Sequence, residues 1–275
     1  MRKILLMAVA SICLATSAFA QTVKPFKEGD RAVFLGNSIT DGGHYHSFIW
    51  LYYMTRFPDM HIRVFNGGIG GDTAYDMNKR LDGDIFSMNP TVLMVTFGMN
   101  DSGYFEYNGD NAKEFGEQKY QESIKNFQQM EKRFKELPHT RIVMTGTSPY
   151  DETAQIKDNT VFKKKNETIK RIIEYQRESA ARNGWEFTDW NAPMVAINQE
   201  LQQKDPSFTL CGNDRIHPDN DGHMVMAYLF LKAQGFAGKD VANMEINANK
   251  KQAVKAEGCT ISNIKKIGKD ISFDY

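Results

Sequence analysis

The chain has 275 residues, of which 41% are hydrophobic and 25% are charged, as is usual for a globular protein. This length suits one sizeable domain and leaves little room for a second full one. The 34 lysine and arginine residues balance the 34 aspartate and glutamate residues. Because a balanced charge gives no attraction to nucleic acid or to an anionic membrane, we expect neither as a partner and favour a neutral or weakly charged small molecule.

The first 20 residues have the pattern of a signal peptide. Arg2 and Lys3 precede an apolar stretch, and Ala18-Phe19-Ala20 is an A-x-A cleavage site. The apolar stretch is too short to serve as a stable membrane anchor. We therefore expect an exported protein that is periplasmic or extracellular after cleavage.

From Asp30 onward, short apolar runs alternate with longer amphipathic stretches, which is typical of strands and helices around a mostly parallel sheet. In chain order, we expect a strand at 31–35, a helix at 45–56, a strand at 62–65 that ends at a glycine cluster, and a helix from 72 or 73 to about 87. A continuous apolar run at 91–97 predicts a strand buried on both faces. The remaining expected elements are a helix at 119–136, a strand at 141–147, a helix at 161–183, a strand at 185–189, and helices at 194–203 and 222–234.

Five parallel strands with helices between them predict an α/β fold, namely a flavodoxin-like three-layer sandwich with a five-stranded, mostly parallel, doubly wound sheet. The lysine-rich tail is different in character. Its residues 259–264 and 269–273 predict two short strands, either a small β-hairpin or the start of a longer element. We therefore divide the chain into a signal peptide at 1–20, a main domain at 21–240 and a C-terminal extension at 241–275.

Four loop segments carry side chains suited to catalysis. Three of them directly follow expected strands and the fourth precedes the last expected helix. In sheets of this kind, ligands bind at the carboxyl ends of the strands, so we expect the segments to meet there. The four segments are Gly36-Asn37-Ser38-Ile39-Thr40, Gly68-Ile69-Gly70-Gly71-Asp72, Gly98-Met99-Asn100-Asp101 and Asp214-Arg215-Ile216-His217-Pro218.

Ser38, His217 and Asp214 supply the residue types of a catalytic triad. A serine hydroxyl becomes an effective nucleophile when a base removes its proton, and a histidine is suited to this at neutral pH. Of the six histidines, only His217 has both an acid three residues before it and a proline after it. Asp214 is placed to fix the tautomer of that imidazole. The alternative for Ser38 is a helix N-cap, and the alternative for His217 is an incidental surface histidine.

Together the four segments resemble the sequence blocks of the SGNH (GDSL-like) hydrolase family, over roughly residues 30–235. The resemblance implies that the main domain is an SGNH hydrolase domain with Ser38, Asp214 and His217 as its catalytic residues. It also implies an oxyanion hole made by the main-chain N–H groups of Ser38 and Gly71 and by the side chain of Asn100. Gly70 is the rival of Gly71.

Two neighbouring residues are expected to support this machinery. The family usually has an aspartate before the nucleophile, where this chain has Asn37. An asparagine keeps the shape and one acceptor but loses the charge, so we expect activity to survive. Asp101, next to Asn100, is the second supporting residue.

The resemblance implies a secreted serine esterase that hydrolyses carboxylic esters through an acyl-enzyme and needs no cofactor. We favour removal of short acyl groups, acetyl above all, from a small-molecule or glycan ester. A lysophospholipase or thioesterase is one alternative, and an inactive carbohydrate-binding relative is another. Tyr104, Phe105 and Tyr107 either line a subsite or pack under an insertion.

Metal binding and disulfide formation have little support in the sequence. The pair His44 and His46 has few carboxylates nearby, so no metal site is expected. Cys211 and Cys259 are free to pair in an oxidising compartment, but nothing in the sequence forces them together, and the oligomeric state is open as well. The run Lys163-Lys164-Lys165 is expected on a solvated helix face.

Overall fold

The computed structural model describes residues 22–157 and 160–275. The expected signal peptide therefore lies outside the described residues. The described chain forms two compact units, one that ends at Gly235 and one that spans Phe236–Tyr275. Each unit is considered by itself.

A single five-stranded sheet forms the centre of the first unit. Its strands pair in the order β2-β1-β3-β4-β5, and every pair is parallel. This order and direction confirm the predicted flavodoxin-like α/β fold. The strands are β1 (Arg31–Gly36), β2 (Arg63–Gly68), β3 (Val92–Val95), β4 (Arg141–Gly146) and β5 (Glu186–Asp189).

The second strand differs from its prediction because it runs through the first two glycines of the glycine cluster. We expected it to end at Phe65, but Gly67 and Gly68 pair with the last two residues of β1. A Cβ at Gly68 would lie 2.2 Å from the main-chain nitrogen of Asp41. Glycine at this position therefore lets the turn after β1 pack closely on β2, next to the serine.

The predicted helices are all present, with changes at their ends. The helix expected at 119–136 begins earlier, at Ala112. The helix expected to run to about residue 87 stops at Arg80, and the chain continues as a π-helical turn (Leu81–Ile85) and a 3-10 turn (Phe86–Met88). Another 3-10 turn, η3, spans Phe105–Asn108. The helices are α1 (Ser38–Asp41), α2 (His44–Arg56), α3 (Ala74–Arg80), α4 (Ala112–Phe134), α5 (Lys165–Asn183), α6 (Asn191–Gln202) and α7 (Asn220–Ala233).

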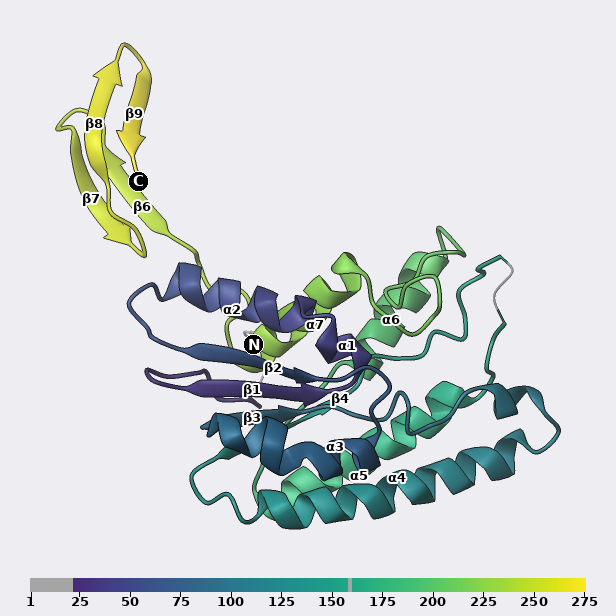
Figure 1. The fold of residues 1–275 in the computed structure, drawn as a ribbon. Coiled ribbons are helices and arrows are strands. Elements are labelled where there is room, and N and C mark those ends of the chain that lie inside the picture. The colour runs from purple at the N-terminus through teal and green to yellow at the C-terminus, as the bar shows by residue number, and fades with distance from the viewer. Residues whose placement is uncertain (1–21, 158–159) are drawn as a thin grey trace, which may run out of the picture. The chain divides into compact units, whose positions relative to one another are not determined.

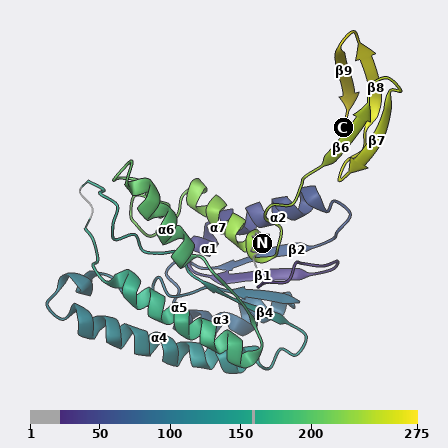
Figure 2. The ribbon, with the colours of Figure 1, turned by 180° about the vertical axis from the view of Figure 1, so that it is seen from behind.

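Helices cover both faces of the sheet. Helices α2 and α7 lie on one face, and α3, α4 and α5 lie on the other (Figure 1). The same three layers are visible from behind in Figure 2. No helix within residues 22–157 and 160–275 is long and apolar enough to cross a membrane.

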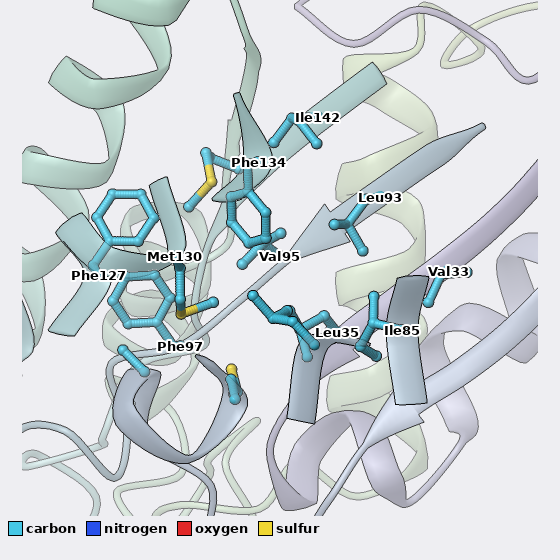
Figure 3. Close-up of a cluster of buried hydrophobic side chains, with 14 of the residues drawn as sticks. Val33, Leu35, Ile85, Leu93, Val95, Phe97, Phe127, Met130, Phe134 and Ile142 are labelled. Atoms are coloured by element: carbon cyan, nitrogen blue, oxygen red, sulfur yellow. The ribbon is translucent and has the colours of Figure 1, made fainter. Parts of the chain in front are cut away.

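The main hydrophobic core lies between the sheet and the α3, α4 and α5 layer. Val33 and Leu35 of β1 point into it and pack with Phe127 and Phe134 of α4 (Figure 3). Phe34, between them in the strand, points to the other face, where its ring packs against aromatic residues of α2 and α7. Burial on both faces holds the ends of β1 and β3 in place, and the site is built on those ends.

The second unit consists of two antiparallel hairpins. One pairs β6 (Asn243–Asn247) with β7 (Gln252–Glu257), and the other pairs β8 (Ser262–Ile267) with β9 (Asp270–Asp274). The sequence predicted the second hairpin and missed the first, whose strands are short and polar.

Cys211 and Cys259 are both free thiols.

Candidate active site

Ser38 stands at the end of β1, as the first residue of α1. Asn37 is the N-cap of this short helix, and its side-chain oxygen accepts the N–H of Ile39 at 3.1 Å. At the first helical position, the main-chain N–H of Ser38 has no acceptor inside the helix. Asn37 is 1% exposed, so its amide caps the turn without burying the charge that an aspartate would bring.

The structure brings Ser38, His217 and Asp214 together in one hydrogen-bonded line. The hydroxyl oxygen of Ser38 lies 2.8 Å from Nε2 of His217. On the other side of the ring, Nδ1 of His217 lies 2.6 Å from Oδ2 of Asp214. The other carboxylate oxygen, Oδ1, accepts the N–H groups of Ile216 and His217 at 2.9 Å each. The three residues meet as the sequence predicted, although 179 positions separate the serine from the histidine.

The interaction between Asp214 and His217 makes the histidine more basic. The bond from Asp214 raises the pKa of His217 above its usual 6.5, burial opposes this, and the negative charge of Asp214 adds to the rise. Burial alone would raise the pKa of Asp214, but the bonds from the His217 ring and from two main-chain N–H groups lower it below its usual 3.8. Asp214 therefore stays ionised and can support a positive charge on His217.

A buried arginine, which the sequence reasoning missed, holds the loop of the acid and the base. Arg215 lies between them in the chain, is 2% exposed and adopts a left-handed φ of 69°. Its Nη1 donates to the carbonyl oxygens of Asp151 and Ala154 at 3.1 and 2.7 Å. The side chain of Arg215 thus points into the fold, while the side chains of Asp214 and His217 stay about half exposed. An arginine in a polar loop segment gives no sequence signal of burial.

Asn100 links the second and third motif loops. Its side-chain Nδ2 donates to the main-chain oxygen of Asp72 at 2.9 Å, which leaves one amide hydrogen for another acceptor. Gly71, directly before Asp72, is solvent-exposed and has a φ of 85°, a region that favours glycine. An added Cβ at the rival Gly70 would lie 4.0 Å from Cβ of Ser38. The choice between Gly70 and Gly71 as donor stays a prediction.

Asp101 ties the Asn100 loop to the helices below it. Its carboxylate accepts the N–H groups of Ala74 and Gly98 at 2.9 and 3.0 Å, and the hydroxyl of Ser123 donates to it at 3.1 Å. Burial raises its pKa, while these three bonds lower it. The carboxylate therefore fixes the end of β3 against the start of α3 and the middle of α4.

The position of Lys165 differs from the one that we expected from the sequence. We placed it on a solvated helix face, but it is 0% exposed. Its Nζ donates to the main-chain oxygens of Met99 and Gly103 and to the hydroxyl of Ser102, at 2.5 to 2.7 Å. The N-terminus of α5 thus carries a cation into the turn that follows Asn100. Burial lowers the pKa of Lys165, and the charges of Asp101 and Glu152 oppose that shift.

The aromatic residues after Asn100 divide between packing and surface. Tyr107 is buried: its hydroxyl donates to the main-chain oxygen of Ser102 and is hydrogen-bonded to the hydroxyl of Thr168, so it packs within the fold. Phe105 is 78% exposed, and its ring meets Phe162 edge-on at 5.4 Å. Within the described parts of the chain, no group of three or more histidine, cysteine, aspartate or glutamate residues is arranged to hold a metal ion.

A parallel sheet of this order, with these loops at its carboxyl edge, is the architecture of an SGNH-type hydrolase. The model of the GDSL-like lipase/acylhydrolase family matches residues 34–225, which is more than half of the chain. The chain belongs to this family and is a carboxylic ester hydrolase. This confirms the resemblance seen in the sequence.

Three known proteins are similar to the chain in sequence or in structure. An acetylxylan esterase from Geobacillus stearothermophilus is 25% identical over 225 residues, which are 76% of this chain and 95% of that esterase. The solved structure of Axe2, an acetylxylan esterase of the same organism, has a TM-score of 0.60 and a sequence identity of 23%. The match covers 76% of this chain and 96% of Axe2, and at this identity it shows a likeness of the fold alone. The structure of BT4096, a gut microbial diltiazem-metabolizing enzyme, is 98% identical with a TM-score of 0.89 over 92% of this chain. The present chain spans 57% of that protein.

Proposed function

We propose that the chain hydrolyses esters of short carboxylic acids, acetate above all, through an acyl-enzyme on Ser38. The observation that carries this proposal is the continuous line from Ser38 through His217 to Asp214, with distances of 2.8 and 2.6 Å. These are the distances at which a serine can lose its proton to a histidine that a carboxylate orients.

In the first half of the reaction, Oγ of Ser38 attacks the ester carbonyl while Nε2 of His217 takes its proton. The tetrahedral intermediate collapses as the bond to the alcohol oxygen breaks, and His217 returns the proton to the departing alcohol. In the second half, water attacks the acyl-enzyme, His217 takes the water proton, and the proton passes to Ser38 as the acid leaves. Asp214 stabilises the imidazolium at both stages without being protonated.

The negative oxygen of each intermediate needs fixed donors. In the proposed site these are the N–H groups of Ser38 and Gly71 and the free amide hydrogen of Asn100. Preorganised donors of this kind contribute about 3 to 4 kcal/mol each to the barrier reduction in comparable enzymes. All three lie at the ends of β1, β2 and β3, whose packing fixes their positions.

The open character of the site supports a short acyl group. The side chains of Asp214 and His217 are about half exposed, at 51% and 49%, and Gly70 and Gly71 are exposed as well. Two cavities along α5, of 370 and 750 Å³, are lined by other residues. A shallow site holds an acetyl group and leaves the alcohol part in solvent, whereas a long acyl chain needs an apolar channel to bury it.

The relatives support the same substrate class. One is an acetylxylan esterase, and another metabolises diltiazem, a drug that carries an acetate ester. We propose that this chain removes acetyl groups both from glycans and from ring-bearing small molecules such as diltiazem. Mass spectrometry of diltiazem incubated with the chain would then find the deacetylated alcohol. A demethylated product would contradict an ester hydrolase.

Hydrolysis of 4-nitrophenyl acetate, butyrate and octanoate by the wild type and by Ser38→Ala tests the central proposal. We expect the highest kcat/KM with acetate and a loss of at least about 1,000-fold in Ser38→Ala. Ser87→Ala, which changes an exposed serine outside the motif loops, is the control and should keep full activity. A preference for octanoate would favour the lipolytic alternative, and a folded but inactive wild type would favour the carbohydrate-binding alternative.

Export is the remaining part of the proposal. It is supported by the basic residues, apolar stretch and A-x-A site at the start of the chain. Cell fractionation with N-terminal sequencing tests it. We expect periplasmic or extracellular protein that begins at Gln21, and intact protein in the cytoplasm would overturn this part without touching the esterase proposal.

A further inference from the structure

Asn100 is useful as an oxyanion donor only if its amide is held in one orientation. An asparagine side chain that turns by 180° about its last bond exchanges its N–H groups for an oxygen, which would repel an oxyanion. The main-chain oxygen of Asp72 accepts one hydrogen of Nδ2 at 2.9 Å and favours the productive orientation. A single bond to one side of the amide still leaves the group free to swing about it.

The second side of the amide is held by Tyr104. Its hydroxyl donates to Oδ1 of Asn100 at 2.5 Å. Because Oδ1 has no hydrogen, the tyrosine can only donate in this bond. Burial raises the pKa of Tyr104, and the nearby charge of Asp214 adds to the rise, so the hydroxyl keeps its proton throughout the neutral range. A hydrogen bond to the amide oxygen also polarises the amide and strengthens its N–H groups as donors.

Tyr104 is in turn held by Lys165. The Nζ atom of Lys165 lies 3.8 Å from the centre of the Tyr104 ring, within the range of a cation–π contact. The same ammonium group donates to the main-chain oxygens of Met99 and Gly103, on either side of Asn100 in the turn. Lys165 therefore fixes both the backbone that carries Asn100 and the ring that orients its side chain.

We propose that Tyr104 is a positioning residue for ester hydrolysis: its hydroxyl orients and polarises the Asn100 amide, and Lys165 holds the tyrosine in place. The inference rests on the proposed function, since it needs Asn100 to stabilise an oxyanion. Tyr104 acts only through Asn100 and makes no bond to the reacting atoms. A purely structural tyrosine would instead affect the stability of the fold and leave the kinetic role of Asn100 unchanged.

A double-mutant cycle on 4-nitrophenyl acetate separates the two roles. Tyr104→Phe removes one oxygen atom and should lower kcat about tenfold with KM within twofold, since the lost interaction forms in the transition state. Asn100→Ala should lower kcat about 100-fold to 1,000-fold. In the Asn100→Ala background, Tyr104→Phe should change kcat less than about twofold, because the group it acts through is gone. An equal tenfold loss in both backgrounds, or an unchanged kcat in Tyr104→Phe, would overturn the inference.

Two further measurements distinguish an oriented amide from a general loss of packing. Tyr53→Phe is a matched control because it also removes a hydrogen-bonded tyrosine hydroxyl, whose partners Phe26 and Gln234 lie outside the motif loops. It should keep the wild-type kcat. A small alkylboronic acid, which forms a tetrahedral adduct on serine, should inhibit Tyr104→Phe about tenfold more weakly than the wild type. An unchanged inhibition constant would contradict the inference.

The proposed function and this inference fail in different ways. If Ser38→Ala keeps its activity, the esterase proposal fails and the effect of Tyr104→Phe has no bearing on an oxyanion hole at Ser38. If Ser38→Ala is inactive while Tyr104→Phe matches the wild type, only the positioning role is overturned.

Discussion

The guanidinium of Arg80 and the carboxylate of Asp72 form a largely buried ion pair in the loop that carries Gly71, with Nε 2.6 Å from Oδ2. The same arginine donates through Nη2 to the carbonyl oxygens of Gly36 and Gly67 at 3.2 and 2.8 Å. These glycines lie in neighbouring strands, β1 and β2. One side chain thus joins the loop that carries Ser38 to the loop that carries Gly71.

Removal of Arg80 should strongly destabilise the first unit. Burial raises the pKa of the Asp72 carboxyl while Arg80 lowers it, so the carboxylate depends on this partner. Breaking a buried pair by removal of one member costs about 3 to 5 kcal/mol. We expect urea denaturation to show that Arg80→Leu lowers the free energy of unfolding by about 3 to 5 kcal/mol. Arg182→Leu, which breaks an exposed pair with Glu178, is the control and should lose less than about 1 kcal/mol. Equal losses would contradict the role of Arg80.

The pH dependence of kcat/KM should follow the raised pKa of His217. The base must be neutral to take the proton of Ser38, so activity rises as His217 loses its own proton. Because Asp214 raises the pKa of His217 above 6.5, the acid limb should have its midpoint above pH 6.5. Asp214→Asn should move the midpoint to lower pH and reduce kcat by about 100-fold or more. A midpoint that stays in place in this variant would show that Asp214 does not act on His217.

Asn37→Asp should change turnover by less than about tenfold. Either side chain offers the oxygen that accepts the N–H of Ile39, and this bond caps the turn under Ser38. Steady-state kinetics on 4-nitrophenyl acetate measure the effect, and Asn37→Ala, which removes the cap, should be worse than Asn37→Asp. A rise above tenfold in Asn37→Asp would mean that the missing charge has a larger part in catalysis.

Gly71→Ala should lower kcat more than Gly70→Ala. Alanine at a φ of 85° brings strain of about 1 to 2 kcal/mol, and relief of that strain would turn the proposed N–H donor away from the oxyanion. At Gly70 an added Cβ would make only ordinary contacts, at 3.7 Å or more. We expect a loss of at least about tenfold for Gly71→Ala and of less than about threefold for Gly70→Ala.

Gly184→Ala controls for strain alone in that comparison. Gly184 has a φ of 67° at the end of α5, with open space around its Cα and no part in the motif loops. This variant should lose stability like Gly71→Ala and keep its kcat. If Gly70→Ala is the more damaging of the two loop variants, Gly70 is the donor.

The sequence alone predicted those features whose signal lies within a few neighbouring residues. Alternating apolar runs predicted all five strands of the sheet, because each strand must bury its own side chains whatever its neighbours are. The spacing of Asp214 and His217 placed acid and base on one turn, since three residues cannot separate them. The turn after β1 placed Ser38 at the edge of the sheet, where ligands of this fold bind.

Tertiary structure alone decided the contacts between distant segments. The 2.8 Å contact of Ser38 with His217 depends on where the last helix begins relative to β1, and composition gives no sign of that. The burial of Lys165 and Arg215 was equally invisible in the sequence, because a charged residue is usually exposed. Oxygen atoms of Met99, Ser102 and Gly103 accept the hydrogens of the Lys165 ammonium group. Carbonyl oxygens of Asp151 and Ala154 accept those of Nη1 of Arg215. A sequence determines which residues can donate, but only the folded chain determines which acceptors they meet.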